Sequence, residues 1–400
     1  MEEVARRVFR AYNYREIRTP IFEETALFAR GVGEETDIVS KEMYTWDDRD
    51  GTSLTLRPEN TASVIRAYIE HRMDQWPGLV KLYYIGPMFR RERPQRGRYR
   101  QFFQIGAEAI GSESPAVDAE VIEMVTEILA QTGLENFQLL INSVGCSDCR
   151  PKFVAALRER LASVKDQLCG DCQRRVDTNP LRVLDCKVPQ DQPIIETLPS
   201  ILDYLDEKCR NHFEAVKTYL NDRGIAYEVK PRLVRGLDYY MRTTFEIVHG
   251  ALGAQNSVLG GGRYDGLAEA LGSKVPSPGI GFSIGEDRLV MSVEEKYTEI
   301  DAVDLFIAPM GEAAFRHCSL IARDIRANGD AVVELAPSGG KLKRLLETAD
   351  KLKSHYALIV GDDEIAAETY TLKDMRTGDQ RKLSRPELIA TFVSPHQEQR

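Results

Sequence analysis

Apolar and polar residues alternate along two stretches of this chain, residues 82–89 and 99–110, which flank a charged loop. Alternation with a period of two is typical of a strand that is buried on one face, and neither stretch has helical spacing. The sequence therefore predicts a hairpin of two strands, with polar side chains on one face and apolar side chains on the other.

The second predicted strand places Gln104, Gly106 and Glu108 on one face, because successive side chains of a strand point to opposite sides. The opposite face is expected to be buried, and it carries Phe103, Ile105, Ala107 and Ala109. Gly106 leaves room between the two polar groups for a small ligand to approach the backbone. The alternative is a half-solvated strand that ends in a charged turn.

Similar patterns predict the elements around this hairpin. Helices are expected at residues 4–12, 62–71 and 114–132, and strands at 16–20, 54–57, 137–142, 234–248 and 278–285. A turn interrupted by proline follows residue 57 and places Arg57, Glu59 and Thr61 at the mouth of a sheet. An ion pair between Arg57 and Glu59 on the surface is the alternative interpretation of that turn.

Long charged helices without a sheet signal are predicted from Cys146 to about residue 228, as an inserted helical module. Within it, Cys146 and Cys149 form one pair and Cys169 and Cys172 another, with 19 residues between the pairs. This spacing predicts one structural zinc held by the four thiolates. Four free cysteines in a helical hairpin would show the same pattern, and Cys186 and Cys209 stand outside it.

Two glycine-rich segments follow the insertion. Residues 260–266, GGGRYDG, resemble a phosphate-binding loop but have neither Rossmann nor Walker spacing. Residues 278–288 predict a buried strand that opens into a helix, with Arg288 in the first turn, where an anion can also bind free backbone N–H groups. Tight packing of the strand against the helix is the alternative.

A polar break at residues 296–301 precedes a regular alternation of elements. Strands are predicted at 303–308, 331–335 and 356–360, helices at 312–328 and 341–353, a hairpin at 369–383 and a last helix from 385. Such alternation predicts a compact α/β domain with a parallel core. Residues 394–400 are expected to be a disordered tail.

Charge and composition limit the class of partner. The chain of 400 residues carries a net charge of −9, which argues against binding of polyanions by its whole surface. Residues 81–110 reverse this sign with seven basic and two acidic residues, which suggests a partner with phosphates. No apolar run approaches a membrane span of ~20 residues, and the odd cysteine count and lack of a signal core favour a reduced, cytoplasmic protein.

Four motifs resemble those of the histidyl-tRNA synthetase family. FRRER at 89–93 and GEDR at 285–288 look like motifs 2 and 3 of class II aminoacyl-tRNA synthetases, and Pro20 stands where the proline of motif 1 is expected. VRGLDYY at 234–240 and LGGGRYDG at 259–266 look like the two histidine-specific motifs. The resemblance runs from residue 1 to about residue 392.

This resemblance implies an α+β fold with several domains and a homodimer. A catalytic domain with the antiparallel sheet of class II synthetases, flanked by helices, is expected at 1–145 and 229–297, and a helical insertion at 146–228. An α/β anticodon-binding domain is expected at 301–393, and the tail at 394–400. The implied reaction joins L-histidine to ATP, as histidyl-adenylate, and then transfers the histidyl group to the 3′ end of tRNA(His), with Mg²⁺ accompanying ATP.

The same resemblance implies a role for individual residues. Arg90 and Arg235 match the catalytic arginines on opposite sides of the α-phosphate and the substrate carboxylate, and Arg90, Glu92 and Arg288 match positions that bind ATP. The positions that match histidine contacts are Glu59, Asn60, Thr61, Arg90, Gln104, Glu108, Arg235, Tyr239 and Tyr240. Loop residues Gln95, Arg96 and Arg98 are expected to touch the acceptor end of the tRNA.

The sequence departs from the family's pattern in two places. Asn60 replaces a glycine, and since asparagine tolerates left-handed backbone, the turn is expected to persist. The usual N-terminal segment with its Arg-Gly-Thr-x-Asp run is not in the sequence, and a late start of this kind is expected to weaken the dimer or the active site.

Two other classes of protein fit parts of the pattern. One is an inactive paralogue, such as the regulatory subunit of ATP phosphoribosyltransferase, which usually lacks the C-terminal domain. The other is a plain RNA-binding protein, which would need the loop arginines but no polar histidine pocket.

Overall fold

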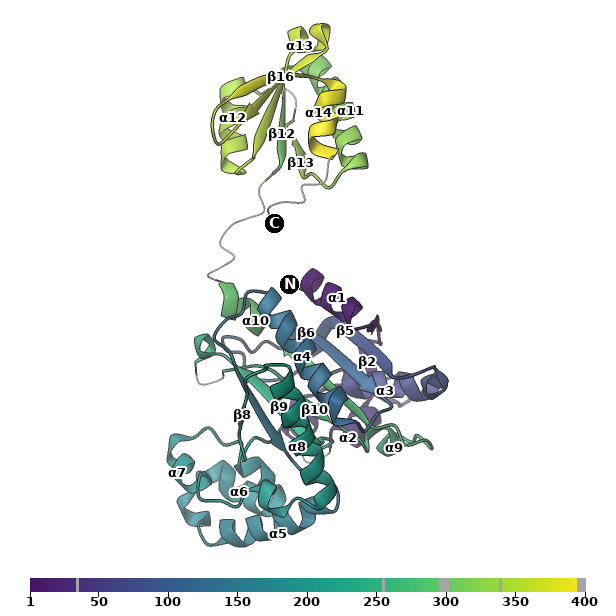
Figure 1. The fold of residues 1–400 in the computed structure, drawn as a ribbon, viewed down its shortest axis with the longest axis vertical. Coiled ribbons are helices and arrows are strands. Elements are labelled where there is room, and N and C mark those ends of the chain that lie inside the picture. Colours follow the sequence, from purple (N-terminus) through teal and green to yellow (C-terminus); the bar gives the residue numbers. More distant parts are fainter. Residues whose placement is uncertain (34–35, 254–255, 295–302, 338–339, 394–400) are drawn as a thin grey trace. The chain divides into compact units, whose positions relative to one another are not determined.

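The computed structural model describes residues 1–33, 36–253, 256–294, 303–337 and 340–393 (Figure 1). The chain divides into two compact units, Met1–Lys296 and Tyr297–Arg400. The break predicted at 296–301 and the tail predicted at 394–400 lie outside the described residues. Within the described part of the chain, no helix is long and apolar enough to cross a membrane.

The first unit is built on an eight-stranded sheet. Its strands, in the order in which they lie side by side, are β1 (Arg15–Glu16), β5 (Val80–Phe89), β6 (Gln101–Ile110), β11 (Gly279–Gly285), β10 (Ser257–Arg263), β9 (Met241–Val248), β7 (Gln138–Ser143) and β8 (Glu228–Val229). The central pairs are antiparallel, whereas the outermost pairs, β1 with β5 and β7 with β8, are parallel. A smaller antiparallel sheet joins β2 (Phe22–Glu24), β4 (Ser53–Leu56) and β3 (Tyr44–Asp47).

The predicted hairpin is confirmed as β5 and β6, which pair antiparallel from Val80–Ile110 to Phe89–Gln101. Ile105, Ala107 and Ala109 are buried as predicted. The prediction that Phe103 is buried is wrong: this residue lies close to the loop end of the hairpin and is 39% exposed.

Helices cover both faces of this sheet. The helices of the first unit are α1 (Glu2–Ala11), α2 (Thr25–Val32), α3 (Thr61–Glu70), α4 (Pro115–Gln131), α5 (Cys149–Ala162), α6 (Gly170–Thr178), α7 (Gln192–Ile195), α8 (Glu207–Asp222), α9 (Leu267–Ala270) and α10 (Glu286–Val293). Apolar residues of α1, α4 and α8 form one core with the sheet, and those of α3 and α9 form a second core with β5. Helix α4 begins where it was predicted: the Ser114 side chain caps its N-terminus, and Pro115 occupies its first turn.

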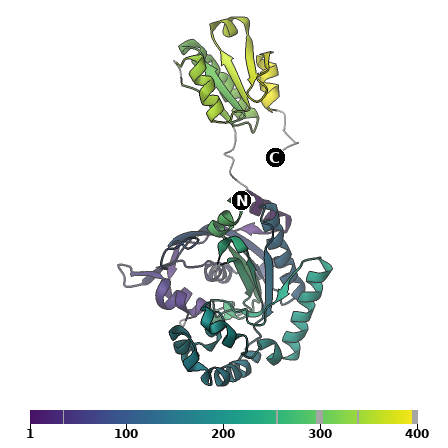
Figure 2. The same cartoon turned by 90° about the vertical axis from the view of Figure 1, so that its left-hand side faces the viewer.

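The insertion has its own small core around α5 and α6. Figure 1 and Figure 2 show α5, α6 and α7 gathered in a lobe beside the sheet. Helix α8 differs, because its Phe213, Val216 and Leu220 belong to the core of the large sheet. The chain therefore leaves the lobe near the start of α8.

The second unit has a five-stranded sheet in the order β13 (Val333–Leu335), β12 (Leu305–Pro309), β14 (Tyr356–Val360), β15 (Thr369–Asp374) and β16 (Gln380–Ser384). Its helices are α11 (Glu312–Asn328), α12 (Leu342–Lys351), α13 (Asp362–Ala367) and α14 (Arg385–Val393). The pairs β12–β13 and β12–β14 are parallel, which confirms the predicted parallel core. Helix α13 was not predicted, since six residues are too few for a periodic signal.

One prediction near the sheet was wrong. The strand expected from residue 234 begins only at Met241, and residues 234–240 form a bent segment beside it. The glycines of the segment 260–266 that resembled a phosphate-binding loop, apart from Gly266, lie inside β10, a central strand.

Candidate active site

A cavity of about 780 Å³ opens over the hairpin and collects most of the predicted site residues. Those that line it are Glu59, Thr61, Arg90, Glu92, Arg98, Gln104, Glu108, Arg235, Tyr239, Tyr240 and Arg288. Asn60, Gln95 and Arg96 do not line it. Segments far apart in the sequence thus converge on one pocket.

Glu108 lies on the floor of this pocket and is 1% exposed. Its Oε1 accepts a hydrogen bond from the Thr61 hydroxyl at 2.8 Å, and its Oε2 accepts one from the Tyr264 hydroxyl at 2.7 Å. Burial raises the pKa of Glu108 to about 8, and these two hydrogen bonds oppose that rise. Burial therefore favours the protonated form of this carboxyl group.

The space around Glu108 depends on two glycines. A Cβ at Gly281 would lie 1.8 Å from Glu108 Oε2, so only glycine leaves room for the carboxyl group. A Cβ at Gly106 would lie 2.4 Å from the ring of Tyr84. The room that we predicted for a ligand at Gly106 is therefore filled by Tyr84, a side chain of the paired strand.

Gln104 also faces the pocket and is 8% exposed. Its Oε1 is buried and has no hydrogen-bond partner among the described residues. A buried acceptor without a partner costs free energy, so a ligand that donates a hydrogen bond would be favoured here.

Arg235 reaches the pocket from the bent segment before β9. Its Nη1 pairs with Glu246 Oε2 at 3.1 Å, and its guanidinium lies over Gly260, where a Cβ would come within 1.9 Å of Nη2. Glu246 was not predicted as a partner of Arg235, and its only signal is its place on the polar face of a strand. Coulombic attraction from Glu246 helps raise the pKa of Arg235 against the effect of burial.

Arg90 and Arg288 are held by backbone carbonyl groups. Arg90 Nε donates to Pro58 O at 2.9 Å, and its guanidinium lies 5.2 Å from the centre of the Phe102 ring. Arg288 Nε donates to Gly97 O at 3.0 Å and its Nη1 to Ser257 O at 2.7 Å. Arg288 thus joins α10 to the hairpin loop and to β10.

The turn before α3 is buried. Glu59 is 4% exposed, and its carboxylate accepts from the backbone N–H groups of Thr61 at 2.7 Å and Ala62 at 3.0 Å. Arg57 is 6% exposed and donates to Pro87 O at 2.9 Å, so the alternative of a surface ion pair is wrong. Asn60 has φ −120°, and its place in the turn needs no left-handed backbone, contrary to our expectation.

The hairpin loop ends in a tight turn. The backbone groups of Gln95 and Arg98 exchange two hydrogen bonds, and Gly97 adopts a φ of +72°, which favours glycine. Arg98 pairs with Glu92 at 2.9 Å at the rim of the pocket. Gln95 and Arg96 are exposed outside it.

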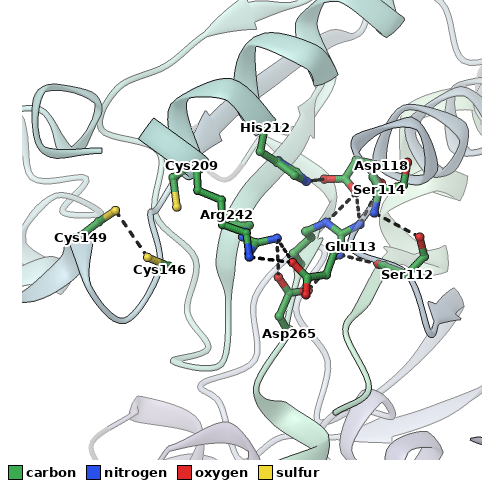
Figure 3. Close-up of polar contacts among 12 residues, drawn as sticks. Ser112, Glu113, Ser114, Asp118, Cys146, Cys149, Cys209, His212, Arg242 and Asp265 are labelled. Atoms are coloured by element: carbon green, nitrogen blue, oxygen red, sulfur yellow. Dashed lines mark hydrogen bonds and ion pairs between the residues drawn. The ribbon is translucent and has the colours of Figure 1, made fainter. Parts of the chain in front are cut away.

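One buried network beside the site was missed by the sequence interpretation. Arg263 follows the glycines of β10 and is fully buried; its Nη2 lies 2.6 Å from Asp118, and its Nη1 lies 2.9 Å from Asp265. Figure 3 labels these two aspartates. Burial raises the pKa of Asp118 to about 6 and lowers that of the neighbouring His212 to about 4. Tyr264 was missed too, although both residues belong to the motif GGGRYDG.

The four cysteines predicted to share one zinc do not form one group. Cys146 and Cys149 lie with Asp206 and Cys209, whereas Cys169 and Cys172 lie with Cys186 and Asp191. The correction has a physical reason: each pair sits at the start of a different helix, α5 or α6, and each helix meets a different later segment. Cys209 and Cys186, which stood outside the spacing, are the third cysteines of the two groups.

Comparisons with known proteins agree with this geometry. Residues 1–289 match the family model described as histidyl-tRNA synthetase, and residues 304–394 match the anticodon binding domain. The histidine–tRNA ligase of Solibacter usitatus is 71% identical over 98% of this chain and 93% of its own length. That of Bacillus subtilis is 48% identical over 97% and 93%, respectively.

Solved structures give the same result. The apo histidyl-tRNA synthetase of S. aureus aligns with a TM-score of 0.79 at 40% identity, over 98% of this chain and 94% of that chain. A protein of Bacillus halodurans described as an ATP phosphoribosyltransferase regulatory subunit/histidyl-tRNA synthetase aligns with a TM-score of 0.65 at 19% identity, over 90% of this chain and 92% of that chain. At that identity the likeness shows the fold alone.

The cavity over the antiparallel sheet is lined by arginines from a hairpin, a bent segment and a helix start, and an anticodon-binding unit follows in the chain. This combination defines a class II aminoacyl-tRNA synthetase. Within that class, the chain belongs to the histidyl-tRNA synthetase family.

Proposed function

We propose that the cavity over β5 and β6 binds L-histidine and ATP together and joins them, and that Arg90 and Arg235 catalyse this step. The protein is an aminoacyl-tRNA ligase, a histidine–tRNA ligase. Its first reaction forms a bond between a carboxylate oxygen of histidine and the α-phosphorus of ATP, and pyrophosphate leaves. The second transfers the histidyl group to the 3′-terminal adenosine of tRNA(His), and AMP leaves.

The observation that carries this proposal is the convergence of Arg90, Arg235 and Glu108 on one cavity. Attack by a carboxylate on a phosphate brings negative charges together, so fixed cations lower the barrier. Guanidinium groups stay charged and can bond two oxygens at once. Contacts with Pro58 and Glu246 hold these two arginines in place before the substrates arrive.

Histidine recognition is assigned to Glu108 and Gln104, with Tyr239 and Tyr240. A neutral imidazole offers one N–H donor and one acceptor. Glu108 holds one proton near neutral pH and can donate it to the ring or accept the ring N–H once it has lost it. The site would select histidine over other amino acids, because a side chain that cannot form a hydrogen bond with Glu108 would leave this buried group without a partner.

Other predicted contacts keep their assignments as proposals. Glu59, Asn60 and Thr61 would bind the substrate's ammonium group, which is supported by the carboxylate of Glu59 and the hydroxyl of Thr61 in the lining of the cavity. Arg288 and Glu92 would bind ATP. Enzymes of this class use ATP with Mg²⁺, and carboxylates such as Glu92 and Glu246 line the cavity and suit a hard cation that is bound mainly by phosphates.

We also propose a homodimer and a cytoplasmic location. The acceptor end of the tRNA is proposed to contact Gln95, Arg96 and Arg98. The loop contact is supported by the exposure of Gln95 and Arg96 beside the rim of the cavity. Sedimentation of the purified protein tests the dimer: a monomer at micromolar concentration would contradict it.

Histidine-dependent exchange of pyrophosphate into ATP tests the proposed function. Glu108→Ala should raise the KM for histidine by about 10- to 100-fold, which corresponds to the loss of one hydrogen bond and a buried imidazole nitrogen left without a partner. Arg235→Ala should lower kcat by about 10²- to 10³-fold with a small change in KM, because its contact strengthens in the transition state. Arg10→Ala removes an exposed arginine outside the cavity and should leave both constants unchanged. Exchange that needs no histidine would refute the assignment.

A further inference from the structure

Two groups of side chains in the insertion have the same composition and play no part in the proposed chemistry. One contains Cys146, Cys149, Asp206 and Cys209, and the other contains Cys169, Cys172, Cys186 and Asp191; in each, the ligand atoms lie within 4.8 Å of one another. We propose that each group binds one Zn²⁺ ion through three thiolates and one carboxylate, so that the chain carries two separate structural zinc sites.

The sulfur–sulfur distances fit tetrahedral coordination. A Zn–S distance of about 2.3 Å places two sulfur ligands about 3.8 Å apart, and a sulfur and a carboxylate oxygen about 3.5 Å apart. Cys146 Sγ and Cys149 Sγ are 3.6 Å apart, and Cys169 Sγ and Cys186 Sγ are 3.9 Å apart. These two sulfur pairs would need to shift by only about 0.1–0.2 Å to reach the tetrahedral spacing.

The carboxylates are oriented in the same way in both groups. Asp206 Oδ2 faces Cys146 Sγ at 3.3 Å, while its Oδ1 accepts from the backbone N–H of Cys209 at 2.7 Å. Asp191 Oδ2 faces Cys186 Sγ at 3.2 Å, while its Oδ1 accepts from the backbone N–H of Cys169 at 2.9 Å. One oxygen is thus fixed by a backbone donor and the other is aimed at the thiols, as expected for an oriented metal ligand.

Burial and charge favour an ion over packed thiols. Asp191 is fully buried, and its partners in the described part of the chain are the thiols and a backbone N–H of its own group, not a Lys, Arg or His side chain. A bound Zn²⁺ would supply the cation that a buried carboxylate usually has. In the first group the positive charge of Arg242 acts on Cys209, and Figure 3 shows this arginine beside the cysteines. Such a cation would offset the negative charge left on a zinc with four anionic ligands.

The two zinc sites would stabilise the fold of the insertion. Four of its six cysteines, Cys149, Cys172, Cys186 and Cys209, are buried members of its core. Small modules with little apolar core are often stabilised by a structural metal. The first site would join the entry of the insertion to the start of α8, and the second would join α6 to the segment around residue 186.

The first site would also support the active site. Arg150 follows Cys149 directly, and its guanidinium donates to the backbone oxygens of Asp238 and Tyr240. Zinc bound at Cys149 would therefore fix the arginine that holds the segment carrying Arg235.

Metal content of the full-length protein tests this proposal. Protein expressed with added zinc and purified with a reductant and without chelators should contain two equivalents of zinc by mass spectrometry. Cys209→Ser and Cys186→Ser should each lose one equivalent, and the double variant should lose both. Cys318→Ser is the matched control, since this buried cysteine belongs to the second unit and should leave both ions in place.

Several results would overturn the proposal. Wild-type protein without zinc would do so, as would two equivalents retained in Cys209→Ser. A single equivalent that is lost in Cys146→Ser but kept in Cys209→Ser and Cys186→Ser would restore the site of four cysteines. If the variants do not fold, crystals of the wild-type protein decide the matter: anomalous scattering at the zinc edge should give one peak in each group, and a peak in neither or in only one would contradict two sites.

Discussion

The guanidinium group of Arg235 lies where the side chain of any residue other than glycine at position 260 would begin. A Cβ there would come within 1.9 Å of Nη2 and 2.1 Å of Cζ. Arg235 and Gly260 are 25 positions apart in the sequence, yet the absence of one side chain sets the position of the other.

Gly260→Ala should therefore inactivate the enzyme without changing a catalytic residue. The methyl group would push Arg235 out of place, and a shift of about 1 Å can cost about 10² in rate. Pyrophosphate exchange should show a fall of that size in kcat. Gly250→Ala is the control, because a Cβ there meets nothing within 4 Å. Full activity of Gly260→Ala would mean that Arg235 does not act from this position.

Glu108 gives a pH dependence of stability with a definite sign. Its pKa is raised from 4.5 to about 8 in the folded protein, so the folded state binds more protons than the unfolded state between these values. The contribution of Glu108 to the free energy of unfolding is therefore greatest below pH 4.5 and falls as the pH rises towards 8.

Glu108→Gln removes this titration. The stability of the variant relative to the wild type should increase between pH 5 and pH 8.5, by at most about 5 kcal/mol, since one pKa unit corresponds to about 1.4 kcal/mol. Urea unfolding of both proteins at the two pH values, followed through the transition of the first unit, measures this difference in the free energy of unfolding. A difference that does not change with pH would show that Glu108 is ionised in the folded protein.

Arg263→Lys should destabilise the fold and spare the binding of substrates. Arg263 is fully buried and its guanidinium serves Asp118, Asp265 and two backbone oxygens, a set that an ammonium group cannot satisfy. Breaking a buried pair of this kind costs about 3–5 kcal/mol, so the urea midpoint should fall clearly.

Arg30→Lys, at an exposed arginine, should change the free energy of unfolding by less than about 0.5 kcal/mol. Because Arg263 does not line the cavity, the KM for histidine of the folded fraction of Arg263→Lys should stay as in the wild type. A large rise in KM with normal stability would instead place Arg263 in the site.

Arg96→Ala should separate the two reactions. Arg96 is exposed at the tip of the hairpin loop and does not line the cavity, so pyrophosphate exchange should keep its rate. Aminoacylation should show a KM for tRNA raised by roughly tenfold, and the salt dependence of tRNA binding should become weaker as one phosphate contact is lost. Equal effects on both reactions would contradict a role limited to the tRNA.

The sequence by itself determined the local structure and the chemical types of the site. Alternation predicted β5 and β6, cap residues predicted the start of α4, and the motifs placed arginines at 90, 235 and 288. These signals are local: they depend on the period of burial along one strand or helix and on a few neighbouring residues.

Only the tertiary structure decided which side chains meet. Tyr264 reaches Glu108 across 156 positions, and Tyr84 fills the space that the sequence appeared to leave at Gly106. The cysteines show the same limit, since spacing grouped Cys146 with Cys169, whereas packing joins Cys146 to Cys209. Contacts between distant segments are set by strand register and by how helices pack, and neither is encoded in the spacing of residues along the chain.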